Sequence, residues 1–193
     1  SAFPLGIDSG GGGRKGAPVD LATASLGAAG LRFEPPRAST PANVGAIVRD
    51  LAQEFATTTG SSPIGITIPA VVTHGVVRTA ANIDGSWIGV DADALLSDLL
   101  GRAVTVINDA DAAGIAELHF GAAKDAPGVV IVTTLGTGIG SALLVDGRLV
   151  PNTEFGHLEI DGHDAETQAA ASAREQGDLS WKEWATRLQR YYS

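Results

Sequence analysis

The sequence predicts an α/β fold with two lobes, and two observations carry that prediction. Apolar runs rich in β-branched residues alternate with amphipathic helical patterns along the chain, an order typical of mixed α/β proteins. A strand, a glycine-rich turn and a second strand occur in residues 3–20 and again in residues 129–150. This repeat indicates two related lobes that face each other across a cleft.

The first lobe, residues 1–108, is predicted to combine several strands with two helices. Expected strands cover residues 3–8, 15–20, 26–33, 63–68 and 104–108, and expected helices cover residues 43–58 and 91–100. Apolar residues from Val44 to Phe55 recur at helical spacing, which indicates an amphipathic helix. Gly101 follows the second helix as a typical C-terminal residue.

The second lobe, residues 109–193, begins with an expected helix at 109–120 and continues with strands at 129–135 and 140–145. Asp146-Gly147 is a strong hairpin signal. Ser180 and Glu183 form a capping box that opens a final helix.

Composition excludes several classes of protein. The 193 residues hold 13 Lys and Arg against 22 Asp and Glu, a formal net charge of −9, which argues against a nucleic-acid-binding protein. The chain has no cysteine, so disulfides, thiolate zinc sites and cysteine nucleophiles are excluded. No segment has the pattern of a signal peptide or a membrane span, and we expect a soluble, cytoplasmic protein without a membrane partner.

The two glycine-rich turns are candidate phosphate sites. Glycine lets backbone N–H groups approach an anion that a Cβ would keep away. A single turn of this kind is weak evidence of phosphate binding, whereas two of them, each between strands, point more clearly to it. The candidate residues are Gly10, Gly11, Gly12, Gly13 and Lys15 in the first turn, and Gly136, Thr137 and Gly138 in the second.

Two acidic groups are candidates for chemistry. Asn108-Asp109-Ala110-Asp111 lies where a strand ends and a helix begins, a usual position for ligand-binding side chains, although either aspartate could simply cap the helix. The second group contains Glu154, His157, Glu159, Asp161, His163, Asp164 and Glu166. It fits a divalent-metal site, a sugar pocket whose carboxylates and imidazole pair with hydroxyls, or an exposed acidic loop.

Four segments resemble the ROK family of sugar kinases, which has the two-lobed actin-like ATPase fold, also called ribonuclease H-like. They are Gly6-Ile7-Asp8 with Lys15-Gly16, residues 107–111, residues 135–140 and Glu154-Phe155-Gly156-His157. The run Gly156 to Glu166 is similar to the polyphosphate glucokinase branch of this family, as is the stretch 67–87 with Asn82. Many ROK proteins carry a cysteine-rich zinc motif after the Gly-His pair, and this chain does not, so no zinc is expected.

The resemblance implies a role for each group. Asp109 would be the general base that takes the proton from the 6-hydroxyl of glucose as it attacks a terminal phosphoryl group. The sugar would be bound by Asn82, Asn108, Asp109, Glu154, His157 and Glu166. Asp8 would help to place Mg²⁺ indirectly, and the glycine turns with Thr137 would hold the phosphates of polyphosphate or ATP. Mannose as a second sugar and a homodimer are further expectations from the same likeness.

The chain also departs from the family pattern. The polyphosphate glucokinase branch usually has an apolar residue where this chain has Ser9, Thr or Ser where it has Gly12, and an apolar residue where it has Arg14. Arg14 either contacts phosphate or is merely exposed. A polyanionic donor should meet a basic groove, and only Arg14, Lys15 and Lys124 are candidates for one.

Family members are expected to continue for roughly seventy residues beyond this chain, given typical sizes of two-lobed proteins, which would leave the second lobe truncated at its C-terminus. Two hypotheses follow: an active kinase, or a truncated, catalytically impaired sugar-binding remnant. A transcriptional regulator of the family would need a helix-turn-helix domain ahead of residue 1.

Overall fold

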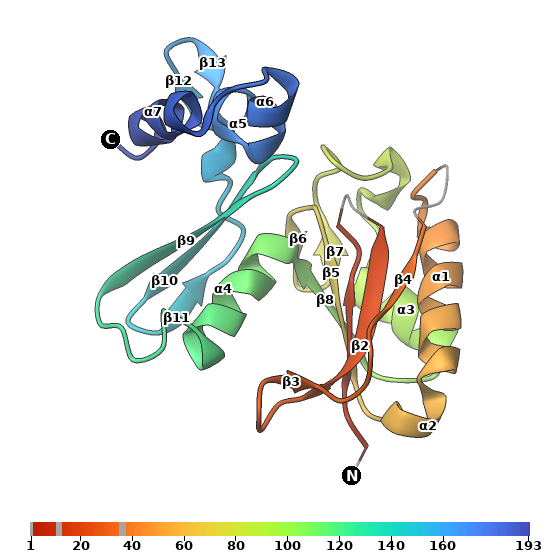
Figure 1. The fold of residues 1–193 in the computed structure, drawn as a ribbon. Coiled ribbons are helices and arrows are strands. Elements are labelled where there is room, and N and C mark those ends of the chain that lie inside the picture. Colours follow the sequence, from red (N-terminus) through yellow and green to blue (C-terminus); the bar gives the residue numbers. More distant parts are fainter. Residues whose placement is uncertain (1, 11–12, 35–37) are drawn as a thin grey trace. The chain divides into compact units, whose positions relative to one another are not determined.

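A computed structural model describes residues 2–10, 13–34 and 38–193 (Figure 1). The chain divides into two compact units, residues 1–109 and 110–193, named here the first and the second unit. Asp109 closes the first unit, although it is also the first residue of helix α4 (Asp109–Phe120). Strands and helices alternate as predicted, and the α/β class is confirmed. No helix among the described residues is long and apolar enough to cross a membrane.

The first unit is built on a six-stranded sheet. Its strands are β1 (Leu5–Asp8), β2 (Arg14–Asp20), β3 (Ser25–Leu26), β4 (Leu31–Phe33), β5 (Ile64–Ile68) and β8 (Val104–Asn108). Strands β1, β5 and β8 pair in parallel, whereas β2 pairs with β1 in antiparallel orientation. Parallel pairing brings the carboxyl ends of β1, β5 and β8 to one edge of the sheet, with Asp8 opposite Thr67 and Ile68 opposite Asn108.

The prediction of one strand at 26–33 was wrong. Strand β3 pairs with β2 through Val19↔Leu26, and β4 pairs with β2 through Gly16↔Leu31. Residues 27–30 therefore lie opposite only residues 17–18 of β2, so the strand is interrupted by extra residues that break the ladder. Glycine at both ends of this insert, Gly27 and Gly30, makes such a break easy to accommodate.

The expected helix at 43–58 is two helices, α1 (Pro41–Glu54) and α2 (Ala56–Thr59). Helix α1 begins earlier than predicted because the Thr40 hydroxyl accepts the backbone N–H of Asn43 at 3.3 Å and Pro41 fills the first helical turn. It ends at Glu54, because the next residue, Phe55, has a φ of −97° and a ψ of 10°, which depart from helical values.

Helices α1 and α3 (Ala92–Leu100) cover one face of the first unit's sheet (Figure 1). The core between these helices and the sheet is mainly aliphatic, and it includes the buried aromatic rings of Phe55 and of Trp87 from the short helix η1 (Gly85–Trp87). The indole Nε1 of Trp87 donates to the Ser39 carbonyl at 2.7 Å, which satisfies its buried polar atom. The fully buried members of the core include Val44, Val48, Leu51, Ile68, Val77 and Leu96. A small hairpin, β6 (Val72–Thr73) and β7 (Val76–Val77), follows β5.

The second unit contains a three-stranded sheet of order β11-β10-β9. Its strands are β9 (Val129–Leu135), β10 (Ile139–Val145) and β11 (Arg148–Val150), and the predicted Asp146-Gly147 turn joins the last two. Gly114 of α4 lies against Ala142 of β10, so a small residue on each side lets helix and sheet approach closely.

The rest of the second unit is made of short elements and three helices. In chain order they are η2 (Phe155–His157), β12 (Glu159–Ile160), β13 (His163–Asp164), α5 (Ala165–Ala169), α6 (Ala171–Gln176) and α7 (Trp181–Tyr191). The predicted capping box at Ser180 and Glu183 is confirmed at the start of α7. Trp184 of α7 donates to the Ala169 carbonyl at 2.9 Å and so ties this helix to α5.

Candidate functional site

The carboxyl edge of the first unit's sheet gathers Asp8, Gly10 and Asp109. The Asp8 Oδ1 atom accepts the Gly10 N–H and the Thr67 hydroxyl, both at 3.0 Å. A Cβ placed on Gly10 would lie 3.2 Å from Asp8 Oδ1 and 3.9 Å from Asp109 Oδ2. The start of the first glycine turn therefore lies between two carboxylates. Gly11 and Gly12 are outside the described residues.

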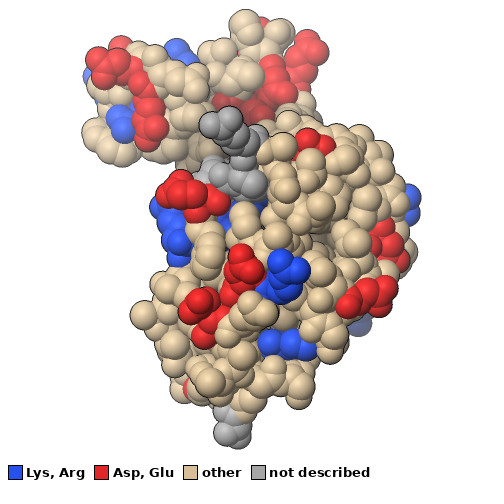
Figure 2. Space-filling model, turned by 90° about the vertical axis from the view of Figure 1, so that its right-hand side faces the viewer, with Lys and Arg blue, Asp and Glu red and all other residues tan. Residues whose placement is uncertain are grey.

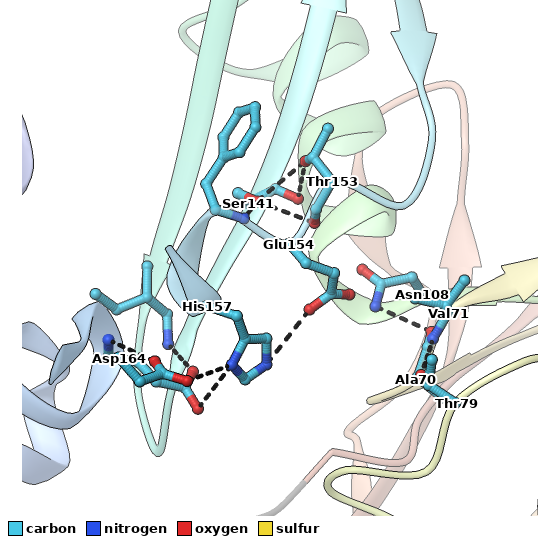
Figure 3. A network of polar contacts seen from close by, with 12 residues as sticks. Ala70, Val71, Thr79, Asn108, Ser141, Thr153, Glu154, His157 and Asp164 are labelled. Carbon is cyan, nitrogen blue, oxygen red and sulfur yellow. Dashed lines mark hydrogen bonds and ion pairs between the residues drawn. The ribbon is translucent and has the colours of Figure 1, made fainter. Parts of the chain in front are cut away.

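Asn108 is buried at the end of β8, where its side-chain amide donates to the Ala70 carbonyl at 3.1 Å (Figure 3). This contact fixes the residue directly before Asp109. Asn82 is exposed in the segment that precedes η1, away from any regular element. The first unit thus fixes Asn108 by burial and by the register of β8, and Asp109 follows it directly in a half-buried position. Asn82 lies on the surface of this unit.

Arg14 is buried, with 3% of its surface exposed, which rules out the interpretation that it is merely exposed. Burial lowers the pKa of its guanidinium, and the negative charge of Asp8 opposes this effect. Its Nε and the Oγ of the equally buried Ser9 have no hydrogen-bond partner among the described residues. Lys15, the next residue, is exposed.

The second glycine turn is held by its own unit. The Gly136 N–H donates to the Gly138 carbonyl at 3.0 Å. Ser172 of α6 donates its backbone N–H to the Gly136 carbonyl at 3.1 Å and its hydroxyl to the Thr137 carbonyl at 2.6 Å. Glu166 of α5 accepts the N–H of Ile139 at 3.0 Å. The Gly136 N–H is thus used within the turn, while the Thr137 side chain is exposed.

Glu154, His157, Asp164 and Glu166 come together in the second unit. The Nδ1 atom of His157 lies 2.9 Å from Asp164 Oδ2 and 3.8 Å from Glu166 Oε1, and its Nε2 lies 3.6 Å from Glu154 Oε2 (Figure 3). The pKa of His157 is raised, chiefly by the hydrogen bond to Asp164 and further by the charges of Glu166, Asp164 and Glu154, while partial burial acts in the opposite direction.

The metal set that sequence spacing would allow, His157 and His163 with Glu159 or Asp161, is not the set that clusters. Asp161 pairs with Arg190 of α7 at 2.8 Å. Among the described residues, ligand atoms of His157, Asp164 and Glu166 lie within 4.8 Å of one another, close enough for one cation. Exposed acidic groups often reach this spacing without an ion, and a hydrogen-bonded imidazole–carboxylate pair accounts for the arrangement by itself.

The segment that carries Glu154 is anchored on both sides. The sequence left Asp111 as either a helix cap or a ligand-binding residue. In the structure it is buried, and its Oδ2 accepts the Asn152 N–H at 2.8 Å. Burial raises the pKa of this carboxyl, and the hydrogen bond from Asn152 opposes the rise. The Ser141 hydroxyl of β10 donates to the Thr153 carbonyl at 3.0 Å (Figure 3). A Cβ on Gly156 would collide with the Ile139 carbonyl, so only glycine lets η2 lie against β10.

Sequence reasoning did not single out three residues that organise these groups. Thr67 bonds Asp8, Asp164 bonds His157, and Ser172 bonds the second glycine turn. Thr67 could have been found from its place near the end of a strand parallel to β1. Asp164 was visible only as one acid among several, and nothing in the sequence distinguishes Ser172.

Figure 2 shows the charged side chains of the described residues on one face of the molecule. Lys and Arg occur there as small separate groups among Asp and Glu.

Comparisons with known proteins agree with the fold and with the motifs. A sequence model described as "ROK family" matches residues 4–174. A polyphosphate glucokinase of Mycobacterium tuberculosis (strain CDC 1551 / Oshkosh) is 48% identical over 187 residues, which are 96% of this chain and 69% of the relative. The polyphosphate glucokinase of Mycobacterium leprae (strain TN) is 46% identical, over 96% of this chain and 57% of the relative.

Solved structures show the same likeness. The inorganic polyphosphate/ATP-glucomannokinase of Arthrobacter sp. strain KM superposes with a TM-score of 0.94 at 52% identity, over 100% of this chain and 78% of that one. A ROK family glucokinase of Streptomyces griseus, solved with glucose and AMPPNP, shares the fold with a TM-score of 0.79 at 23% identity, over 91% of this chain and 59% of that one. The chain belongs to the ROK family.

Proposed function

We propose that this protein transfers the terminal phosphoryl group of inorganic polyphosphate or ATP to the 6-hydroxyl of glucose, giving glucose 6-phosphate. The names of relatives that are 48% and 52% identical support this reaction class. The observation that carries it is the carboxyl edge of the first unit's sheet, where the Asp109 carboxylate lies beside a glycine turn and Asp8. A base next to a turn suited to phosphate is what phosphoryl transfer to an alcohol requires.

Asp109 acts as the general base in this proposal. Phosphoryl transfer depends mainly on positioning and on charge stabilisation, and the base orients the attacking hydroxyl and accepts its proton. Register supports this role, because parallel pairing and the bond of buried Asn108 to Ala70 fix the end of β8 directly before Asp109. The proton leaves the 6-hydroxyl for an Asp109 oxygen as the new oxygen–phosphorus bond forms. The bond from the terminal phosphorus to the bridging oxygen of the donor breaks in the same step, and polyphosphate shortened by one unit, or ADP, leaves with that oxygen.

Sugar binding is assigned to Asn82, Asn108, Asp109, Glu154, His157 and Glu166. Carboxylates accept hydrogen bonds from hydroxyls, and an amide or imidazole N–H donates to hydroxyl oxygens, so this set can pair with several hydroxyls of one hexose. The close group of Glu154, His157 and Glu166 supports the part of the assignment that falls in the second unit.

Phosphate binding is assigned to the two glycine turns, and Mg²⁺ to the neighbourhood of Asp8. The exposed Asp8 carboxylate suits a hard cation held through water. When bound, Mg²⁺ would neutralise charge on the phosphates. Asp8 itself is oriented by the Thr67 hydroxyl and the Gly10 N–H, and the exposed Thr137 hydroxyl is available as a donor.

The experiment is a coupled assay for glucose 6-phosphate, with Mg²⁺ and either polyphosphate or ATP as the sole donor. Asp109→Asn is the matched variant, because it keeps the shape of the side chain and removes the base. We expect turnover that the variant loses by a factor of about 10² or more. Glucose and mannose are compared in the same assay, and the faster donor identifies the preferred one.

Absence of turnover with both donors, in a chain shown to be folded, would overturn the proposal. Glucose titration would then test the alternative, a catalytically impaired chain that still binds the sugar. The buried Arg14 and Ser9 of the first turn favour this alternative, because both replace the residues typical of the polyphosphate glucokinase branch.

A further inference from the structure

Asp164 occupies a position that fixes its carboxylate on two sides. It ends β13 and is the N-cap residue of α5, with φ −60° and ψ 123°. Its Oδ1 accepts the N–H of Glu166 at 3.3 Å, and its own carbonyl accepts the Thr167 hydroxyl at 2.6 Å. The backbone and one carboxylate oxygen of Asp164 are therefore anchored to the helix that carries Glu166.

The second carboxylate oxygen of Asp164 holds the ring of His157. The distance from Asp164 Oδ2 to His157 Nδ1 is 2.9 Å (Figure 3). An ionised carboxylate only accepts hydrogen bonds, so Nδ1 must carry a proton. The ring then offers Nε2 on its other side, which is the atom nearest Glu154.

The β12–β13 hairpin brings these residues together. Glu159 pairs with Asp164 and Ile160 with His163, and the turn between them uses Asp161 and Gly162, whose φ values are 54° and 77°. The Ala165 N–H closes the loop by donating to the Leu158 carbonyl at 2.9 Å. Because the hairpin returns the chain to η2, Asp164 meets His157 although seven positions separate them.

We propose that Asp164 is the positioning residue of the sugar site: it holds His157 through Nδ1 so that Nε2 meets a hexose hydroxyl, and it sets the start of the helix that presents Glu166. This inference rests on the proposed function for its ligand, a hexose. One side chain thereby couples two of the sugar-binding groups, and neither the imidazole nor the Glu166 carboxylate is placed by its own segment alone.

The charges around the ring agree with this role. Glu154 precedes η2, Asp164 ends β13 and Glu166 lies on α5, so carboxylates from three segments face His157, while Tyr191 of α7 lies within electrostatic reach of Glu166. The ring carries its Nδ1 proton in both its neutral and its charged form. Nε2 therefore accepts from a hydroxyl when the ring is neutral and donates to one when the ring is protonated.

The test uses the whole chain and Asp164→Asn, which keeps an oxygen able to cap α5 and removes the charge that faces Nδ1. Nitrogen-15 NMR of the His157 ring reports the tautomer and the titration directly. We expect Nδ1–H as the dominant neutral tautomer in the unaltered chain, and a mixed tautomer with a lower titration midpoint in the variant. Glucose affinity should fall about fivefold, the scale of an ordinary hydrogen bond rather than of a buried charged one, because both side chains are partly exposed.

Asp161→Asn is the matched control, since it removes a carboxylate of the same hairpin that pairs with Arg190 and does not contact His157. It should leave the ring signals and the glucose affinity unchanged. A double-mutant cycle adds a second readout: Asp164→Asn should have no further effect on glucose affinity in a His157→Gln background.

Unchanged ring signals in Asp164→Asn would overturn the positioning role whatever happens to glucose binding. A further loss of glucose affinity when Asp164→Asn is added to His157→Gln would also overturn it, because asparagine still caps α5 and the effect would then reach glucose by a route other than the ring. Absence of glucose binding in the unaltered chain would overturn the proposed function, and with it the sugar as the ligand of Nε2, while the ring signals would still report on the pair.

Discussion

The contact between Gly114 of α4 and Ala142 of β10 gives a quantitative prediction. A Cβ on Gly114 would lie 2.5 Å from the Ala142 Cβ, whereas carbon atoms in contact lie about 3.5–4.0 Å apart. Gly114→Ala therefore requires helix and sheet to separate by about 1 Å. Ala142 is fully buried, as is Leu144 of the same strand, so separating helix and sheet would loosen a packed contact.

Two opposing effects decide the sign of this change. Alanine is favoured over glycine within a helix by about 1 kcal/mol, whereas overpacking a close contact typically costs about 1–3 kcal/mol. The obstacle is a methyl group fixed directly to the backbone, which cannot rotate away. We expect the second unit to lose about 1 kcal/mol of stability, the difference between a mid-range overpacking cost and the helix gain.

Gly45→Ala in α1 is the matched comparison. Its Cβ would lie 2.8 Å from the Cδ2 of Leu99, which is the far end of a flexible side chain and can change rotamer. The gain in helix propensity should then dominate, and the first unit should become more stable or remain unchanged. Gly114→Ala is thus expected to destabilise its unit and Gly45→Ala is not, because the obstacle is fixed to the backbone in the first case and can rotate away in the second.

Urea unfolding and native-state hydrogen exchange of β10 amides measure the effect in the second unit. Adding Ala142→Gly should relieve the contact, with a coupling free energy of about 1 kcal/mol or more in the double-mutant cycle. If Gly114→Ala instead stabilises the second unit by the full helix gain, and the two changes are additive, the close approach of α4 and β10 is refuted.

Three further predictions concern the site and the first unit. Gly156→Ala should weaken glucose binding about tenfold, the scale of a lost supporting contact, because the new Cβ collides with the Ile139 carbonyl and shifts η2; an unaltered affinity in an NMR titration would contradict this. The pKa of His157 is raised in the folded protein. The stabilisation from the charged ring is therefore present below the ordinary histidine pKa of about 6.5 and is lost as pH rises through the higher folded value. Urea unfolding midpoints should fall as pH rises through this interval, and the fall should be smaller in His157→Gln. Thr40→Ala removes the N-cap of α1 and should cost about 1 kcal/mol in urea unfolding, whereas Thr40→Asp, which keeps an acceptor, should cost little.

The sequence by itself determined the order of the elements and the local signals that end them. The amphipathic spacing from Val44 to Phe55 placed a helix, Asp146-Gly147 placed a hairpin, and Ser180 with Glu183 placed a helix start, all confirmed except for details of their bounds. These features depend on residues within a few positions of each other, where backbone geometry and short-range hydrogen bonds act alone. The ROK family could also be recognised from the sequence, because its motifs are short continuous segments.

The tertiary structure decided which side chains meet. Parallel register placed Thr67 beside Asp8, and the β12–β13 hairpin placed Asp164 against His157. Folding of the first unit buried Arg14, which sequence reasoning left open. The broken strand at 27–30 likewise follows from the pairing with β2 rather than from the residues of the strand itself. Such contacts depend on the path of the chain and on its register, and a shift of one residue exchanges the faces of a strand, so no local pattern can fix them.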